Sequence, residues 1–312
     1  MDRARAALTF VPFGIVGALA VGLALAGAFA GPRVVNGPTR SVVPTPSTAG
    51  VSRTASPTAT DPADDAGAML RVHNDLRAAL GAPAVRGDDR VNAAARRHAE
   101  YLARNAVGGH DETPGQAGFT GVSVRDRLDA QGYAGATASE VAISSGSGSE
   151  GVRSLWVLPY HRLGLMHPHA VVAGWGHAEI AGRTATVGVL VYDFASPSPD
   201  RVRSPAAGQR VPATWSGDES PDVLPAGAAR PVGYPVMVVF SNARPVGLRS
   251  ARLTDASGHE VAHEVVPQLY EGDYVAIVPS APLRPGERYR VRLELSLAGD
   301  PVVDEWEFEA ER

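Results

Sequence analysis

The sequence predicts an α+β fold for residues 67–200 and an all-β fold for residues 201–312. Apolar residues recur at three- and four-residue steps between residues 69 and 131, which is typical of helices with one buried face. Strand patterns follow over residues 137–192, and after residue 205 only short strand patterns bounded by Gly, Pro or Asp remain. Helices that precede strands, without alternating with them, favour helices packed on a mainly antiparallel sheet.

The composition excludes several classes of function. The 312 residues include 29 basic and 33 acidic side chains, and the net charge of −4 argues against a general nucleic-acid-binding or anionic-membrane-binding surface. All the basic residues are arginine. The chain has no cysteine, which excludes disulfides, thiolate catalysis and cysteine-ligated zinc.

The N-terminal residues 1–30 carry an export signal. Arg3 and Arg5 precede an uncharged, mostly apolar stretch over residues 6–32, and such a segment leaves its arginines inside the cell. Residues 28–30 read Ala-Phe-Ala, a cleavage pattern of signal peptides, yet the apolar run is also long enough to remain as a transmembrane anchor. Both alternatives place the rest of the chain outside the cytoplasm, either secreted or anchored to the membrane.

Residues 31–66 are rich in Pro, Ser and Thr and lack apolar periodicity, so we expect a disordered linker. Two folded domains should follow, at residues 67–200 and 201–312, and we expect the first to fold on its own. In the first domain, the expected helices cover residues 69–80, 88–102, 123–131 and 151–158, and the expected strands cover residues 137–144 and both sides of a turn at 182–183. In the second domain, the expected strands cover residues 234–240, 248–255, 261–266, 273–279, 288–295 and 304–310.

An ordered series of short motifs runs through residues 69–195. Its members are Asn74 and Arg77, the helix over residues 91–105, Gly109-His110, Arg127, Gly132-Tyr133, Ser139-Glu140, Trp156, Tyr160-His161-Arg162 and Gly174-Trp175-Gly176. The series resembles the CAP (SCP/PR-1-like) superfamily in its bacterial form, and this resemblance implies an α-β-α sandwich. Asn74 and Arg77 lie on one helix face, where we expect them to tie the helix to a loop by hydrogen bonds.

The second domain resembles the bacterial Ig-like domains that accompany such domains. The similarity lies in the stretches 204–215, 232–240 and 283–291, which combine turn residues with alternating strand patterns. It implies an Ig-like β-sandwich.

The CAP resemblance implies that His110, Glu140 and His161 converge in one cleft. Two imidazoles and a carboxylate form a donor set that suits Zn²⁺, with His110 and His161 as the metal ligands. The alternative is a hydrogen-bonded polar cluster in which His161 pairs with Glu140. Many relatives carry a second glutamate where this chain has Pro159, so no separate catalytic base is evident and catalysis is disfavoured.

Two accessory residues accompany this cleft. His177 follows the Gly-Trp-Gly motif and could reach the cleft. Arg162 could anchor an anionic ligand, or it could pair with Asp111, Asp126 or Asp129.

Four other histidines have structural interpretations. His73 and His98 lie within helix patterns, and we expect them at the edge of the core. His167 and His169 flank a proline, and we expect them to be exposed in a loop.

Three functions remain open. The leading one is an extracytoplasmic surface-binding module with a His/His/Glu cleft and an unidentified surface, lipid or protein ligand. It has no nucleic-acid partner, and it contacts the membrane only if the N-terminal segment is retained. The first alternative is a metal-assisted extracytoplasmic hydrolase that uses the same cleft. The second alternative is a structural cell-surface protein with a vestigial cleft.

Overall fold

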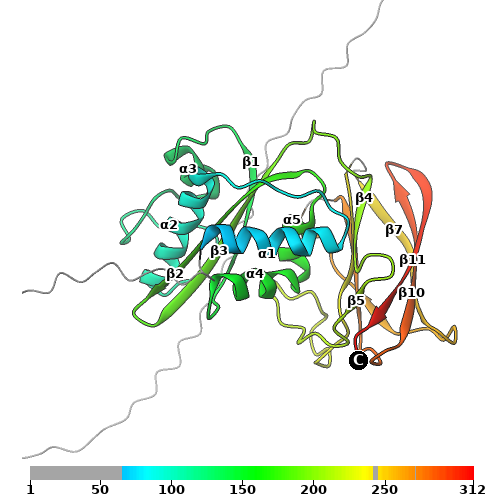
Figure 1. Cartoon of the computed structure of the whole chain (residues 1–312). Coiled ribbons are helices and arrows are strands. Elements are labelled where there is room, and N and C mark those ends of the chain that lie inside the picture. The colour runs from blue at the N-terminus through cyan, green and yellow to red at the C-terminus, as the bar shows by residue number, and fades with distance from the viewer. Residues whose placement is uncertain (1–64, 242–244, 271) are drawn as a thin grey trace, which may run out of the picture. The chain divides into compact units, whose positions relative to one another are not determined.

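The computed structural model describes residues 65–241, 245–270 and 272–312 (Figure 1). The export segment 1–30 and almost all of the linker 31–66 lie outside the described residues. Within the described ranges, no helix combines the length and apolar character needed to cross a bilayer.

The first three helices of the first domain start at polar caps. They are α1 (Ala66–Ala79), α2 (Asp89–Asn105) and α3 (Val124–Ala130). The side chains of Asp65, Asp88 and Ser123 each accept a hydrogen bond from a backbone N–H of the first turn, which satisfies a donor that the helix itself leaves unpaired. The expected starts at residues 88 and 123 are therefore confirmed, and α1 begins three residues earlier than expected.

The central sheet of the first domain is antiparallel, in the order β1-β3-β2. Its strands are β1 (Thr137–Ile143), β2 (Ala170–Ile180) and β3 (Arg183–Tyr192). The β2–β3 hairpin turns through Gly182, whose φ of +74° lies in the left-handed region that glycine adopts without steric cost. The expected strands and turn are confirmed.

Helix α2 packs directly on β2 because two glycines remove the side chains between them. A Cβ on Gly174 would lie 2.3 Å from the backbone of Val91, and a Cβ on Gly176 would lie 2.2 Å from the Cα of Arg96. This contact fixes α2 against one face of the sheet. It also determines which side chains of α2 face the sheet and which face outward.

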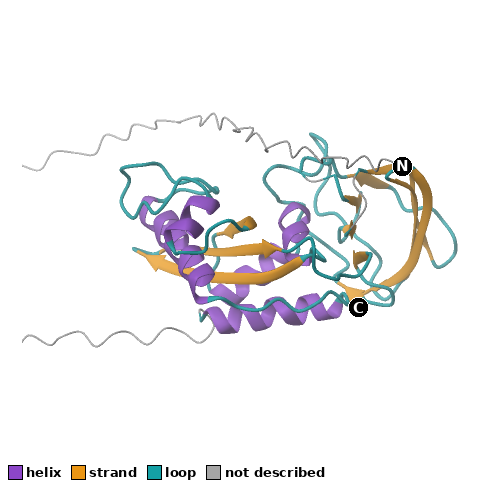
Figure 2. Cartoon of the chain, turned by 90° about the horizontal axis from the view of Figure 1, so that it is seen from above, coloured by secondary structure: helices purple, strands orange, loops and turns teal. Residues whose placement is uncertain are grey.

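The other face of the sheet carries α1, α4 (Gly148–Trp156) and α5 (Pro159–Met166) (Figures 1 and 2). Helices therefore cover both faces, with separate apolar cores on the two sides. Helix α5 was not expected from the sequence pattern. Pro159 occupies its first turn, where the missing N–H costs no hydrogen bond.

The second domain is β-rich, as expected. Its strands form two four-stranded sheets, in the orders β5-β11-β10-β7 and β4-β6-β9-β8, with an apolar core formed by residues of both sheets. The strands are β4 (Arg201–Ser204), β5 (Arg210–Val211), β6 (Val236–Phe240), β7 (Val246–Asp255), β8 (His263–Val265), β9 (Tyr274–Pro279), β10 (Arg288–Leu297) and β11 (Asp300–Ala310).

One apolar core crosses the expected boundary at residue 200. Trp156 and Leu165 of the first domain belong to the same buried cluster as Trp215, Met237 and Tyr274 of the second. The two halves are therefore joined by a continuous hydrophobic contact as well as by the chain.

Candidate binding site around His110 and Glu140

His110 and Glu140 lie together although they come from different elements. Helix α2 ends at Asn105, its C-cap Ala106 has a left-handed backbone, and His110 lies in the segment that follows. Glu140 lies in the middle of β1, opposite Val189 of β3. Nδ1 of His110 is 3.2 Å from Oε1 of Glu140, so the structure brings together two of the three residues assigned to the cleft.

The Glu140 carboxylate is buried and saturated with donors. Its Oε2 accepts a 2.7 Å hydrogen bond from Nη2 of Arg127 on α3, and its Oε1 is 3.3 Å from Nε2 of His98 on α2. Burial alone would raise the pKa of Glu140. The hydrogen bond from His110 and the charges of His98 and Arg127 outweigh that effect and hold the pKa below its usual value.

A second buried carboxylate, that of Glu112, completes the cluster. Its Oε1 is 3.0 Å from Nδ1 of His98, and its Oε2 accepts the backbone N–H of Thr120. The Thr120 hydroxyl donates to the same carboxylate. His98 therefore lies between Glu112 and Glu140: its Nδ1 faces Glu112, and its Nε2 is 3.3 Å from both the Gly109 carbonyl and the Glu140 carboxylate.

The charges of this buried cluster balance. A carboxylate accepts hydrogen bonds but does not donate them, so both His98 contacts are satisfied only when both ring nitrogens carry hydrogen. His98 and Arg127 then provide two positive charges against the two negative charges of Glu112 and Glu140. Such pairing is what allows four ionisable side chains to remain in the interior.

His110 is the exposed member of the site. Its side chain is 53% exposed, whereas that of Glu140 is 2% exposed. Because Glu140 only accepts, Nδ1 of His110 must donate, and a neutral His110 then presents Nε2 as a hydrogen-bond acceptor. Arg127 also donates to the His110 carbonyl at 2.9 Å, which fixes the backbone beneath the ring.

His161, the third residue assigned to the cleft, has a different partner. It lies on α5, where Nδ1 is 2.7 Å from Oε1 of Glu219 and the backbone N–H contacts the same oxygen. Among the described residues no contact joins it to His110 or Glu140. The carboxylate partner of His161 is therefore Glu219 of the second domain, and the expected pairing of His161 with Glu140 is not formed.

These residues do not fit a zinc site. Both oxygens of Glu140 already accept from cationic or imidazole donors, and the Arg127 guanidinium lies where a metal ion would have to compete with it. In the described part of the chain, no three His, Cys, Asp or Glu side chains are grouped to hold a metal ion. His110 and His161, the two expected metal ligands, contact different carboxylates and do not form one site.

The accessory residues also differ from expectation. Arg162 is fully buried and bonds to none of the three aspartates proposed for it. Instead it donates to the carbonyls of Trp156, Val157 and Pro235 and to the Ser204 hydroxyl. Burial lowers its pKa. It cannot reach an external anion because its guanidinium is buried and already donates to these carbonyl and hydroxyl groups.

His177, the other accessory residue, lies on β2 and faces β3 across the hairpin. Its Nδ1 is 2.8 Å from the hydroxyl of Thr186, its cross-strand neighbour. This contact therefore ties His177 to β3.

Three other histidines, His73, His167 and His169, are more buried than their local sequence indicated. His73 is fully buried, with Nε2 2.9 Å from the Leu165 carbonyl, and burial lowers its pKa to about 3. The expectation that His167 and His169 are exposed is wrong. Both are buried because the second domain covers them through the Asp273 carboxylate and the Ser241 carbonyl.

Other expectations for helix α1 are confirmed. Asn74 exchanges two hydrogen bonds with the backbone of Val85, and Arg77 donates to the carbonyls of Pro83, Leu165 and His167. Both residues tie α1 to the loop that follows it, and Arg77 also ties it to the end of α5.

Sequence reasoning missed the buried part of the site. His98 was assigned to the core edge, Glu112 was not considered, and Arg127 appeared only as a motif residue. One signal was present: His98 lies on the apolar face of α2 beside Ala95 and Leu102, where an ionisable side chain needs a buried partner.

Comparison with known proteins identifies the first domain. Residues 70–192 match the family model described as CAP, the Cysteine-rich secretory protein family. No curated protein matches the sequence. Among solved structures, an extracellular protein containing an SCP domain from Bacillus anthracis str. Ames is 19% identical, with a TM-score of 0.34. The match covers 41% of this chain and 41% of the Bacillus protein.

Two further solved structures show similarly low scores. An outer surface protein from Borrelia burgdorferi is 16% identical with a TM-score of 0.34, covering 39% of this chain and 88% of that one. CopC from Methylosinus trichosporium OB3b is 18% identical with a TM-score of 0.25, covering 35% of this chain and 88% of that one. Scores this low indicate no function, whereas the family match coincides with the helices and sheet described above. Residues 70–192 are a CAP domain.

Proposed function

We propose that this chain is an extracytoplasmic surface protein whose CAP domain binds a ligand through His110. The observation that supports this most directly is the contrast between His110, which is half exposed, and its partner Glu140, which is buried. A surface imidazole anchored to a buried, charge-balanced cluster is pre-oriented, so little side-chain entropy is lost when a ligand binds it.

The extracytoplasmic location rests on the sequence of residues 1–30, which reads as a signal peptide or a membrane anchor. Residues 31–66 then act as a spacer that holds the folded domains away from the membrane or wall. We assign the two-sheet second domain to the Ig-like type, in keeping with its paired sheets and short strands.

Co-sedimentation tests the binding function. The full chain is mixed with purified bacterial wall sacculi and, separately, with vesicles of phosphatidylethanolamine and phosphatidylglycerol. We expect binding to one of these surfaces and a loss of about tenfold in affinity for His110→Ala. The matched control is His259→Ala, since His259 is 81% exposed in the second domain. Equal binding of all three proteins would exclude His110 as the contact.

Acid–base hydrolysis is a second candidate, favoured by the 3.2 Å contact that orients the His110 imidazole against a carboxylate. The test is hydrolysis of p-nitrophenyl esters by the full chain with and without a metal chelator. Activity that resists the chelator and disappears in His110→Ala would favour this candidate. Surface binding without turnover would favour the binding module.

A further inference from the structure

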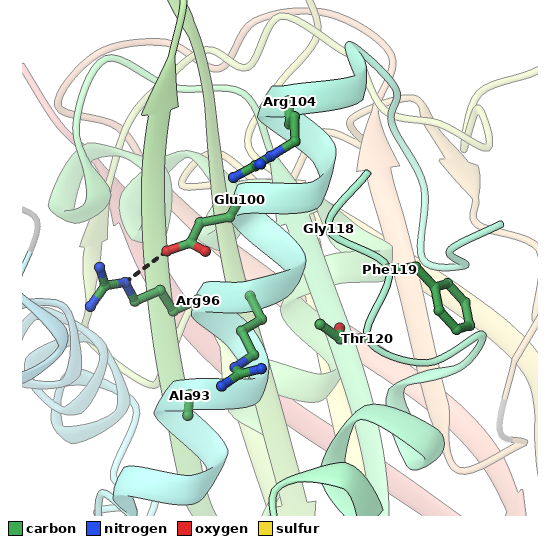
Figure 3. Close-up of a pocket in the computed structure, with 8 residues that line it drawn as sticks. Ala93, Arg96, Glu100, Arg104, Gly118, Phe119 and Thr120 are labelled. Carbon is green, nitrogen blue, oxygen red and sulfur yellow. Dashed lines mark hydrogen bonds and ion pairs between the residues drawn. The ribbon is translucent and has the colours of Figure 1, made fainter. Parts of the chain in front are cut away.

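A groove of about 540 Å³ lies along the outer side of α2, and none of the residues that line it is His110 or Glu140. One wall is the exposed face of the helix, and the other is the segment of residues 118–120 (Figure 3). A volume of this size is typical of small-ligand sites. The lining residues are Ala93, Arg96, Arg97, Glu100, Arg104, Gly118, Phe119 and Thr120.

The groove is positively charged although the whole chain carries a net charge of −4. Three arginines and one glutamate line it, which leaves a net charge of +2. Arg96 is paired with Glu100 at 3.1 Å, as the dashed line in Figure 3 shows. Arg97 and Arg104 are exposed, and among the described residues neither has a carboxylate within ion-pair distance.

The two unpaired arginines share one face of the helix. Positions 97 and 104 are seven residues apart, which is about two turns and about 10 Å along the axis. The Arg104 side chain lies against Gly118, where a Cβ would be 3.7 Å from its Nε. Both side chains are long enough to converge on one group in the groove.

The second wall is held in place by hydrogen bonds to buried or helical groups. Asn105 donates to the Ala117 carbonyl at 2.9 Å. The backbone N–H and hydroxyl of Thr120 both donate to the buried Glu112 carboxylate. The groove therefore exists before a ligand arrives, which lowers the entropic cost of binding.

We propose that this groove binds a phosphomonoester. A phosphomonoester carries a charge of about −1.5 to −2 at neutral pH, so one group neutralises both Arg97 and Arg104, whereas a carboxylate, sulfate ester or phosphodiester carries only one charge. Guanidinium groups also match the phosphate oxygens with paired hydrogen bonds. The ring of Phe119 points away from Glu100 and forms an apolar outer edge (Figure 3).

Calorimetric titration of the full chain with glycerol 3-phosphate tests the proposal. The double variant Arg97→Gln/Arg104→Gln should weaken binding by at least about tenfold, because it removes the two charge-assisted donors. Glu100→Gln should tighten binding, because it removes the carboxylate of the groove and frees Arg96. Arg153→Gln is the matched control, since Arg153 is exposed on α4 and forms no ion pair with any described residue.

The ligand's own charge provides an independent check. Binding should weaken as the pH falls from 7.5 to 5, because the phosphomonoester gains a proton with a pKa near about 6 while the arginines stay charged.

Vesicles that contain phosphatidic acid distinguish a lipid source from a soluble one, and binding of either probe supports the proposal. Equal affinity for the wild type and the double variant, or equal affinity for methyl sulfate and glycerol 3-phosphate, would overturn it. His110→Ala should leave this affinity unchanged, so the failure of this site and that of the His110 site are distinguishable.

Discussion

The Arg127 guanidinium donates to the Glu140 carboxylate at 2.7 Å, with both side chains almost completely buried. This ion pair links α3 to β1 and lies directly beneath His110. It determines both the charge balance of the interior and the position of the exposed imidazole.

We expect Arg127→Met to lower the free energy of unfolding by about 3–5 kcal/mol, because it leaves two buried carboxylates with one cationic partner. Urea denaturation of the full chain measures the change. Arg125→Met is the control on the same helix, where the side chain is exposed, and it should change stability by no more than about 0.5 kcal/mol. Similar effects of the two substitutions would show that the buried pair does not stabilise the fold.

Local structure was more predictable from the sequence than long-range pairing. The start of α2 was predictable because Asp88 is a strong helix cap that precedes an amphipathic pattern. Helix α5 was missed because its N-cap, Leu158, provides no side-chain hydrogen bond. Capping is a local property of the sequence, whereas α5 is held by packing.

The candidate site was only partly predictable, because it depends on contacts between residues that are far apart in the sequence. His110 and Glu140 were paired through family resemblance, whereas His161 binds a glutamate 58 residues further along the chain, in the other domain. No local spacing reveals such a contact. The burial of His167 and His169 has the same origin, because the second domain covers them.

The buried imidazole of His73 should make stability depend on pH. Its pKa is about 3 in the folded chain against an ordinary value of 6.5, so below pH 6.5 the unfolded chain binds a proton that the folded chain does not. The free energy of unfolding should therefore fall as the pH decreases, by about 0.7 kcal/mol per pH unit at pH 6.5 and by about 1.4 kcal/mol per pH unit close to pH 5.

Urea denaturation between pH 6.5 and 5 measures this slope, in a window above the ordinary pKa of Glu140. In His73→Asn the slope should be smaller by about that amount. An identical slope in the variant and the wild type would mean that His73 is protonated in the folded protein.

The two domains should unfold together. Trp156 and Leu165 share a core with Trp215 and Tyr274, and the buried Arg162 donates to the Ser204 hydroxyl and the Pro235 carbonyl in the second half. We therefore expect one cooperative thermal transition for the full chain. A fragment that ends at residue 200 should lose this transition, because its apolar surface and Arg162 lose their partners.

Circular dichroism and calorimetry on both proteins test this expectation. A fragment with its own cooperative transition, close in temperature to that of the full chain, would show that the first domain is autonomous, as its sequence suggested.

The central feature of the proposed site is that Glu140 holds His110 with Nε2 facing outward. Side-chain ¹H–¹⁵N NMR of the full chain at neutral pH measures it directly, with the His110 signal assigned by its absence in His110→Gln. We expect neutral His110 to carry its hydrogen on Nδ1, because the carboxylate of Glu140 can only accept, and we expect Glu140→Leu to abolish that preference. A hydrogen on Nε2 in the wild type, or an unchanged spectrum in Glu140→Leu, would contradict the account.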